Sequence, residues 1–151
     1  MIRKTPLEAW IASKIGMSED TLTREQISGY QLRQLRETIE RTYHNSPFYR
    51  KRMKGIADVP LTSLDDIRRF PFTIAEDIRQ QGLQFLCVSQ NDINRVVTLD
   101  SSGTTGSPKR LYFTPTDQEL TVDFFHQGMS TLVDPGDRVL ILLPGERIGS
   151  V

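Results

Sequence analysis

Cysteine and histidine are almost absent from this chain, and their scarcity excludes several kinds of site. Among 151 residues there is one cysteine, Cys87, and there are two histidines, His44 and His126. A single cysteine cannot form a disulfide within the chain, and so few ligands leave no zinc-binding cluster. Cys87 lies in the apolar run 85–88, and we interpret it as a small buried hydrophobic residue, not a nucleophile.

The chain also lacks an excess of charge of one sign and any long hydrophobic run. Its 19 Lys and Arg balance its 19 Asp and Glu, so no overall field favours nucleic acid or an anionic membrane surface. No apolar stretch approaches the ~20 residues of a transmembrane helix, and residues 1–4 carry no apolar signal core. We therefore expect a cytoplasmic protein of one domain, with no nucleic-acid and no membrane partner.

What the chain does have is a nine-residue segment rich in glycine and hydroxyl groups that ends in lysine. It reads Ser101-Ser102-Gly103-Thr104-Thr105-Gly106-Ser107-Pro108-Lys109. Glycine lets successive N–H groups converge on an anion, hydroxyls add rotatable donors, and lysine adds a point charge. We interpret the segment as a phosphate-binding loop whose candidate binding residues are Ser101, Ser102, Gly103, Thr104, Thr105, Gly106 and Lys109. A flexible surface loop is the alternative, which Pro108 disfavours by stiffening the loop before the lysine.

The spacing within this loop excludes two common phosphate-binding motifs. A Walker A loop counted from Gly103 would need glycine at 108 and Ser or Thr at 110, where the chain has Pro108 and Arg110. The dinucleotide motif fails because residue 105 is Thr. The β-branched run 95–99 and the run 110–114 predict a strand on each side of the loop. The sequence therefore predicts a flap between two strands, not a strand–loop–helix site.

The first half of the chain carries explicit helix start signals. Five residues can cap a helix and are each followed by residues suited to a first helical turn: Thr5, Thr23, Ser46, Ser63 and Thr73. Gly16, Gly55 and Gly82 stand where they can end the preceding helices. We therefore predict an N-terminal helical region over residues 1–82.

Residues 83–151 carry signals of both strands and a helix. Strands are predicted at 84–88, 95–99 and 110–114. A capping box at Thr116–Glu119 predicts a helix through Leu132, and its inward-facing residues would be Leu120, Phe124, Phe125 and Met129. The apolar run 138–143 is typical of a strand buried on both faces, which needs neighbouring strands and covering helices. The predicted class is α/β, with a sheet that is incomplete in this chain.

Three groups of residues admit both a functional and a structural interpretation. The basic run 50–54 could bind nucleic acid or a phosphate of coenzyme A, but a solvated helix face explains it. Tyr43, Phe48 and Tyr49 could wall a ligand, but their helical spacing favours the core. Asp123 and His126 are three residues apart, which we interpret as a local surface contact and not a catalytic dyad.

The loop resembles the phosphate loop of the adenylate-forming superfamily, which has the pattern (Ser/Thr)-(Ser/Thr)-Gly-(Ser/Thr)-Thr-Gly-x-Pro-Lys. Residues 101–109 fit this pattern at every position. Within the superfamily the likeness is greatest to the phenylacetate–CoA ligase and coenzyme F-390 synthetase-like group. Further resembling stretches occur in the expected order at 45–50, 63–67, 70–73, 76–79 and 134–139. The resemblance extends from about Thr23 to Pro144.

The resemblance implies that residues 83–151 begin the AMP-binding α/β core, after the helical region 1–82. It also implies a two-step reaction. A small carboxylic acid attacks the α-phosphorus of ATP and releases pyrophosphate, and a thiol, usually of coenzyme A, then takes the acyl group. In this family the loop, here Ser101 to Gly106, wraps the β- and γ-phosphates, with Thr104 and Thr105 as donors. Lys109 would be the counter-charge, Mg²⁺ would bridge the phosphates, and catalytic residues are expected beyond the C-terminus.

Residues 144–149 differ from the aromatic, glycine-rich segment of phenylacetate ligases, so the resemblance does not imply an arylacetate substrate. The 151-residue chain alone is expected to be inactive, because the acyl and adenine pockets of the family lie further on. Two alternatives stay open. One is a non-catalytic nucleotide- or partner-binding module that retains only the loop, and the other is a structural fragment whose loop binds nothing. A homo-oligomer that completes the sheet is a further expectation.

Overall fold

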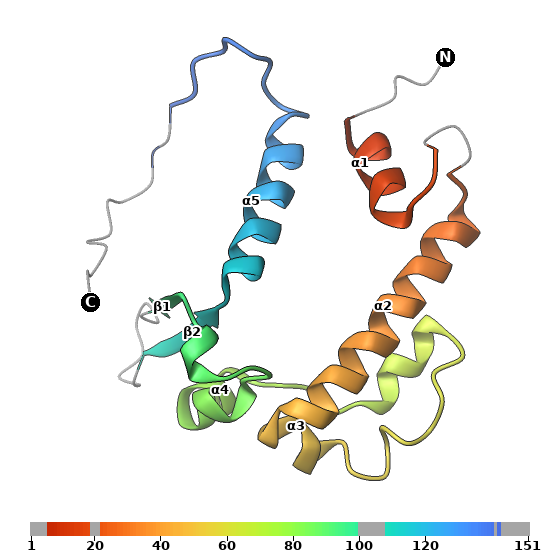
Figure 1. The fold of residues 1–151 in the computed structure, drawn as a ribbon, viewed down its shortest axis with the longest axis vertical. Helices are drawn as coiled ribbons and strands as arrows, with labels where there is room; N and C mark the ends of the chain where they lie inside the picture. Colours follow the sequence, from red (N-terminus) through yellow and green to blue (C-terminus); the bar gives the residue numbers. More distant parts are fainter. Residues whose placement is uncertain (1–5, 19–21, 100–107, 141, 143–151) are drawn as a thin grey trace.

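The computed structural model describes residues 6–18, 22–99, 108–140 and 142. In chain order its elements are helices α1 (Pro6–Ile15), α2 (Arg24–Asn45) and α3 (Pro47–Arg52), the 3₁₀ helix η2 (Leu64–Arg69), helix α4 (Ala75–Gln81), the 3₁₀ helices η3 (Gly82–Phe85) and η4 (Gln90–Asp92), strands β1 (Arg95–Leu99) and β2 (Lys109–Phe113), and helix α5 (Pro115–Met129). The elements form a ring (Figure 1), in which α2 and α5 are opposite sides. Helix α1 joins them at one end, and α3, η3, α4 and β2 join them at the other. This mixed architecture confirms the α/β class.

Three predicted helix starts are confirmed at the predicted capping residue. Thr23 caps α2, since its hydroxyl accepts from the Gln26 N–H and the Gln26 side chain accepts from the Thr23 N–H. Ser46 caps α3, and Ser63 precedes η2, where Asp66 accepts its N–H at 2.9 Å. α1 begins at Pro6 as expected, and its predicted cap, Thr5, lies outside the described residues.

Two predicted caps are displaced. α4 begins after Ile74, whose N–H donates to Asp77 at 3.0 Å, while the predicted cap Thr73 shares a hydroxyl hydrogen bond with Tyr49. α5 begins after Thr114 and not at Thr116. Thr114 is the N-cap for two reasons. The next residue is proline, which is preorganised for the first helical position, and Thr114 forms a reciprocal capping box with Asp117.

Two of the three glycines predicted to end helices adopt the left-handed conformation, and the third follows a helix end without it. Gly16 and Gly55 adopt φ of +81° and +76°, the left-handed conformation that ends a helix after α1 and near α3. α4 also ends as predicted, at Gln81 with Gly82 as its C-cap, but Gly82 has φ of −44° and starts the 3₁₀ helix η3 without a left-handed turn.

The best-packed part of the molecule lies where α2 meets α3. Ser46 is fully buried there and serves two helices, since its N–H donates to the Thr42 carbonyl at the end of α2 and its hydroxyl caps α3. The hydroxyl also donates to the Gln84 carbonyl at 2.9 Å, which ties η3 to this joint. The hydrophobic residues buried among the described residues are Ala12, Phe48, Met53 and Leu61.

The predicted strand at 84–88 is wrong, because this segment starts in η3 and then continues without a strand. The Phe85 ring stacks on Phe48 with centroids 4.0 Å apart, and Ser46 takes up the Gln84 carbonyl. A strand at this place would withdraw both groups from the α2–α3 joint. Tertiary packing therefore decides the local conformation over β-propensity.

The other two predicted strands are confirmed within one residue. β1 and β2 pair antiparallel, with Arg95 opposite Phe113 and Leu99 opposite Lys109. β2 also lies against η3, where a Cβ added to Gly82 would be 3.7 Å from the Tyr112 ring and 4.0 Å from the Arg110 carbonyl oxygen. The hairpin is thereby attached to the helical region.

α5 leads away from the sheet and meets α1 at a polar junction (Figure 1). The Asp123 carboxylate accepts from the Trp10 indole at 2.9 Å and pairs with Lys14 at 2.7 Å. The hydrogen bond from Lys14 and then that from Trp10 lower the pKa of Asp123. Phe124 adds a tilted ring contact with Trp10, at 6.2 Å between centroids. We call these contacts between Trp10, Lys14, Asp123 and Phe124 the α1–α5 latch.

Apart from the contact of Phe124 with Trp10, the apolar residues of α5 and of the run after it do not pack inward. Leu120, Phe124, Phe125 and Met129, predicted to face a core, are exposed. Residues 138–140 and 142, predicted as part of a buried strand, form no strand and are also exposed. The periodicity of these segments is that of buried elements, but the described part of the chain supplies no surface that covers them.

None of the helices in the described part of the chain is both long enough and apolar enough to cross a membrane.

Candidate functional site

The β1–β2 hairpin frames the predicted phosphate loop. The chain leaves β1 at Leu99 and returns at its neighbour Lys109, so the residue after the loop starts a strand and not a helix. This confirms the strands that were predicted on both sides of the loop. The candidate residues Ser101, Ser102, Gly103, Thr104, Thr105 and Gly106 lie outside the described residues, and their binding role stays a prediction.

Lys109 is the one candidate binding residue that the structure describes. It is partly buried at the start of β2, where pairing with Leu99 fixes its backbone. Its ammonium group pairs with no carboxylate among the described residues. A cation that no described carboxylate neutralises, beside a glycine- and hydroxyl-rich segment, is suited to attract an anion such as a phosphate.

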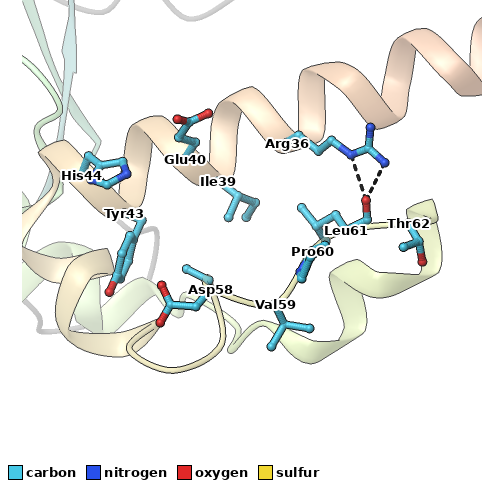
Figure 2. Close-up of a pocket in the computed structure, with 11 residues that line it drawn as sticks. Arg36, Ile39, Glu40, Tyr43, His44, Asp58, Val59, Pro60, Leu61 and Thr62 are labelled. Atoms are coloured by element: carbon cyan, nitrogen blue, oxygen red, sulfur yellow. Dashed lines mark hydrogen bonds between the residues drawn. The ribbon is translucent and has the colours of Figure 1, made fainter.

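A separate pocket of about 420 Å³ lies between α2 and the segment that follows α3 (Figure 2). It is lined by Arg36, Ile39, Glu40, Tyr43, His44, Ala57, Asp58, Val59, Pro60, Leu61 and Thr62. No residue of the hairpin lines it, so it is distinct from the frame of the phosphate loop. Tyr43 is half-buried in the pocket wall, whereas Phe48 is buried in the core. The prediction that Tyr43, Phe48 and Tyr49 belong to the core is therefore confirmed fully only for Phe48.

Arg36 closes one end of this pocket. Its Nε and Nη2 atoms both donate to the Leu61 carbonyl, at 2.8 and 2.6 Å (Figure 2). The contact joins residues 25 positions apart and holds the 57–62 segment against α2. The sequence did not predict this contact. An arginine on an exposed helix face does not indicate that it will bind a backbone carbonyl 25 residues away.

Replacing Arg36 with Met is expected to lower the free energy of unfolding by ~1–2 kcal/mol, since a hydrogen bond to a charged group contributes about 1.5–3 kcal/mol and this side chain is partly exposed. Met keeps the aliphatic stem and removes the donors. Arg33→Met is the matched control, because Arg33 stacks on Tyr30 within the same helix, a contact of ~0.5 kcal/mol. Urea unfolding of both variants measures the difference. Equal losses would show that the Leu61 contact adds nothing.

The other chemically active side chains have structural roles. Cys87 is half-buried, and burial raises the pKa of its thiol, which disfavours a nucleophilic thiolate. Asp123 binds Trp10 and Lys14 in the α1–α5 latch and not His126, so the predicted local contact between Asp123 and His126 is not formed as a hydrogen bond or ion pair. Arg52, within the basic run 50–54, pairs with Asp77 at 2.9 Å and lies over the Phe48 ring. Within the described ranges no three His, Cys, Asp or Glu side chains converge on a metal position.

No protein-family model matches the chain, but three curated proteins do. Phenylacetate–coenzyme A ligases of Pseudomonas putida and Aromatoleum evansii are both 34% identical, over 101 and 98 residues. The ligase of the same name from Escherichia coli strain K12 is 29% identical over 101 residues. The matches cover 65, 63 and 65% of this chain and 23, 22 and 23% of the three relatives, respectively.

These comparisons show what the chain is related to. It is related in sequence to phenylacetate–coenzyme A ligases over about two-thirds of its length. The chain spans less than a quarter of the length of the curated relatives it matches.

Proposed function

We propose that this chain is the N-terminal part of an ATP-dependent acid–thiol ligase that works through an acyl-adenylate. Residues 1–82 form its helical region, and residues 83–151 begin its nucleotide-binding core. The relatives' names support the ligase class, and the loop sequence between two antiparallel strands supports nucleotide binding. The observation that carries the proposal is Lys109, a partly buried cation without a carboxylate partner among the described residues, directly after that loop.

In the first step a carboxylate oxygen of the acid forms a bond to the α-phosphorus of ATP, and the bond from that phosphorus to the bridging oxygen of pyrophosphate breaks. The backbone of Ser101 to Gly106 and the hydroxyls of Thr104 and Thr105 hold the β- and γ-phosphate oxygens. Lys109 stabilises the negative charge that grows on the leaving pyrophosphate, because donors placed in advance need no reorganisation during reaction. Mg²⁺ bound to the phosphates would neutralise further charge, and the described residues offer it no carboxylate cluster.

In the second step a thiol sulfur forms a bond to the acyl carbon as the thiol proton is released to solvent, and the bond from that carbon to the AMP oxygen breaks, so that AMP leaves with the bonding electron pair. We propose coenzyme A as this thiol, since the relatives are coenzyme A ligases by name. The groups that activate the acid and the thiol belong to the three-quarters of the relatives' length that this chain does not match. The chain by itself is therefore proposed to bind the triphosphate without completing the reaction.

Lys109→Ala is expected to weaken the binding of Mg²⁺–ATP by about 10- to 100-fold, the range for loss of a charge-assisted hydrogen bond of 1.5–3 kcal/mol. Isothermal titration calorimetry on the 151-residue chain measures this. Lys54→Ala is the matched control, since Lys54 is an exposed lysine outside the hairpin, and its affinity should equal that of the parent chain. Equal affinities for the two variants, or no binding by the parent chain, would contradict the proposal.

A second candidate function is a binding module without catalysis, which would use the loop and the partly buried Lys109 to hold a triphosphate. ATP–pyrophosphate exchange with a panel of carboxylic acids distinguishes the two. Exchange by a longer chain that includes residues 1–151 supports the ligase. Triphosphate binding without exchange in that longer chain supports the module.

A further inference from the structure

The β1–β2 hairpin depends on its neighbours for its position. A two-stranded hairpin by itself is marginally stable in water, and each of these strands has five residues. Among the described elements, its main contacts outside the hairpin are those of β2 with α4, η3 and α5. What fixes the place of the hairpin therefore acts through β2.

Gly82, the first residue of η3, is the point where β2 rests on the helical region. A Cβ at Gly82 would lie 3.7 Å from the Tyr112 ring, 3.9 Å from its hydroxyl and 4.0 Å from the Arg110 carbonyl oxygen. These are ordinary van der Waals distances, so alanine fits, whereas the two γ branches of an isoleucine would press on β2. Gly82 has φ of −44° and ψ of −46°, which every residue can adopt. What glycine provides here is the absence of a side chain, and not a special backbone conformation.

The helical region holds Gly82 in place from both sides. After it, η3 is tied to the α2–α3 joint, since the Ser46 hydroxyl donates to the Gln84 carbonyl at 2.9 Å. Before it, α4 is tied to α3 by the ion pair of Arg52 with Asp77, at 2.9 Å. A side chain larger than alanine at position 82 is therefore expected to displace β2 and not η3.

Lys109 lies on the face of β2 opposite to this contact. Successive side chains of a strand point to opposite faces, so Tyr112 and Lys109, which are three residues apart, lie on different faces. η3 thus supports one face of β2, and Lys109 is on the other, where its backbone pairs with Leu99. A shift of β2 carries the Lys109 cation with it.

We propose that Gly82 is a positioning residue for Lys109: the bare backbone at Gly82 seats the Tyr112 ring and thereby sets the place of β2 and of the Lys109 cation. The helical region takes part in this way in the site that the hairpin frames. The consequence for nucleotide binding rests on the proposed function, whereas the consequence for the hairpin does not.

The position of the hairpin is tested first, without nucleotide. Gly82→Ile is expected to shift the Leu99 and Lys109 amide resonances in the ¹⁵N–¹H spectrum of the 151-residue chain, and Gly82→Ala should leave them near their parent positions. Gly29→Ile is the matched control, because Gly29 is in α2 and a Cβ added there has nothing within 4 Å. The control should move neither resonance. Tyr112→Ala removes the other partner of the contact and should shift both, which keeps the test decisive if Gly82→Ile does not fold.

Calorimetry with Mg²⁺–ATP then tests the consequence for binding. Gly82→Ile is expected to weaken binding about 10-fold, since a misplacement of ~1 Å in a preorganised site can cost up to ~100-fold. Gly82→Ala and Gly29→Ile should keep the parent affinity. In the Lys109→Ala background, Gly82→Ile should weaken binding no further, because two residues that act through one contact are not additive. A merely structural effect of Gly82→Ile would lower the affinity in both backgrounds.

Three results overturn the proposal. The first is a folded Gly82→Ile or Tyr112→Ala chain whose Leu99 and Lys109 resonances move no more than in Gly29→Ile. The second is an unchanged affinity for Mg²⁺–ATP in Gly82→Ile, and the third is an equal weakening with and without the Lys109 side chain. A parent chain that does not bind Mg²⁺–ATP contradicts the proposed function instead, and the two resonances then decide whether Gly82 sets the place of Lys109.

Discussion

Phe48→Ala is expected to lower the free energy of unfolding by about 3–5 kcal/mol, the usual loss for a buried Phe truncated to Ala. Phe48 is 5% exposed and stacks on Phe85 at 4.0 Å between centroids. Tyr49 packs edge-on against it at 5.2 Å, and the Arg52 guanidinium lies over its ring. Since few other hydrophobic side chains of the described residues are buried, we expect the neighbours to have little capacity to refill the cavity.

Urea unfolding followed by far-ultraviolet circular dichroism measures this loss. Phe72→Ala is the matched control, because the same truncation is made on a side chain that is 88% exposed. We expect the control to change stability by less than ~0.5 kcal/mol, as for most surface substitutions. A loss for Phe48→Ala no larger than that of the control would mean that the α2–α3 joint is not the stabilising core.

Ser46→Ala is expected to cost about 2–4 kcal/mol, more than an ordinary helix cap. Loss of the α3 cap accounts for ~0.5–2 kcal/mol. The Gln84 carbonyl also loses its donor at 2.9 Å, and an unsatisfied buried acceptor costs ~1–3 kcal/mol. Because Ser46 is fully buried, water cannot take the place of the hydroxyl without a rearrangement.

Thr23→Ala is the control for Ser46→Ala, since Thr23 caps α2 at an exposed site. Its loss should be about 1 kcal/mol, the typical effect of a cap alone. Equal losses in the two variants would indicate that the bond to Gln84 contributes nothing. Hydrogen exchange at the start of η3, faster in Ser46→Ala only, would locate the additional effect.

Local signals predicted the helices well, because caps and turns are decided by neighbours in the chain. Thr23 and Ser46 cap the helices expected of them, since a hydroxyl and a nearby N–H suffice. α5 had two possible N-caps, Thr114 and Thr116. It begins after Thr114, because Pro115 is preorganised for the first helical position. The strands on both sides of the loop were also predictable, β1 from its β-branched residues and β2 from its aromatic residues.

Features that depend on distant partners could not be predicted in the same way. The conformation at 84–88 is set by Phe48 and Ser46, almost 40 positions earlier. The hydrogen bond from Arg36 to Leu61, and the pocket beside it, form where α2 meets the 57–62 segment. No local sequence pattern predicts that these two segments lie together. The apolar periodicity of α5 predicted burial, but periodicity only says which face can be covered, and not whether the chain provides the cover. For the candidate site, the hairpin was predictable, and the contribution of residues 101–106 and of Lys109 to binding stays a prediction.

The latch has a practical consequence for following this molecule in solution. Trp10 is the single tryptophan of the chain, and its indole N–H is engaged by Asp123 where the ring of helices closes. Indole emission responds to the polarity around it, so the fluorescence spectrum is an intrinsic reporter of this one junction, far in the sequence from the Phe48 core. Separation of α1 from α5 can thus be observed optically, without a label, as an event distinct from the loss of helix.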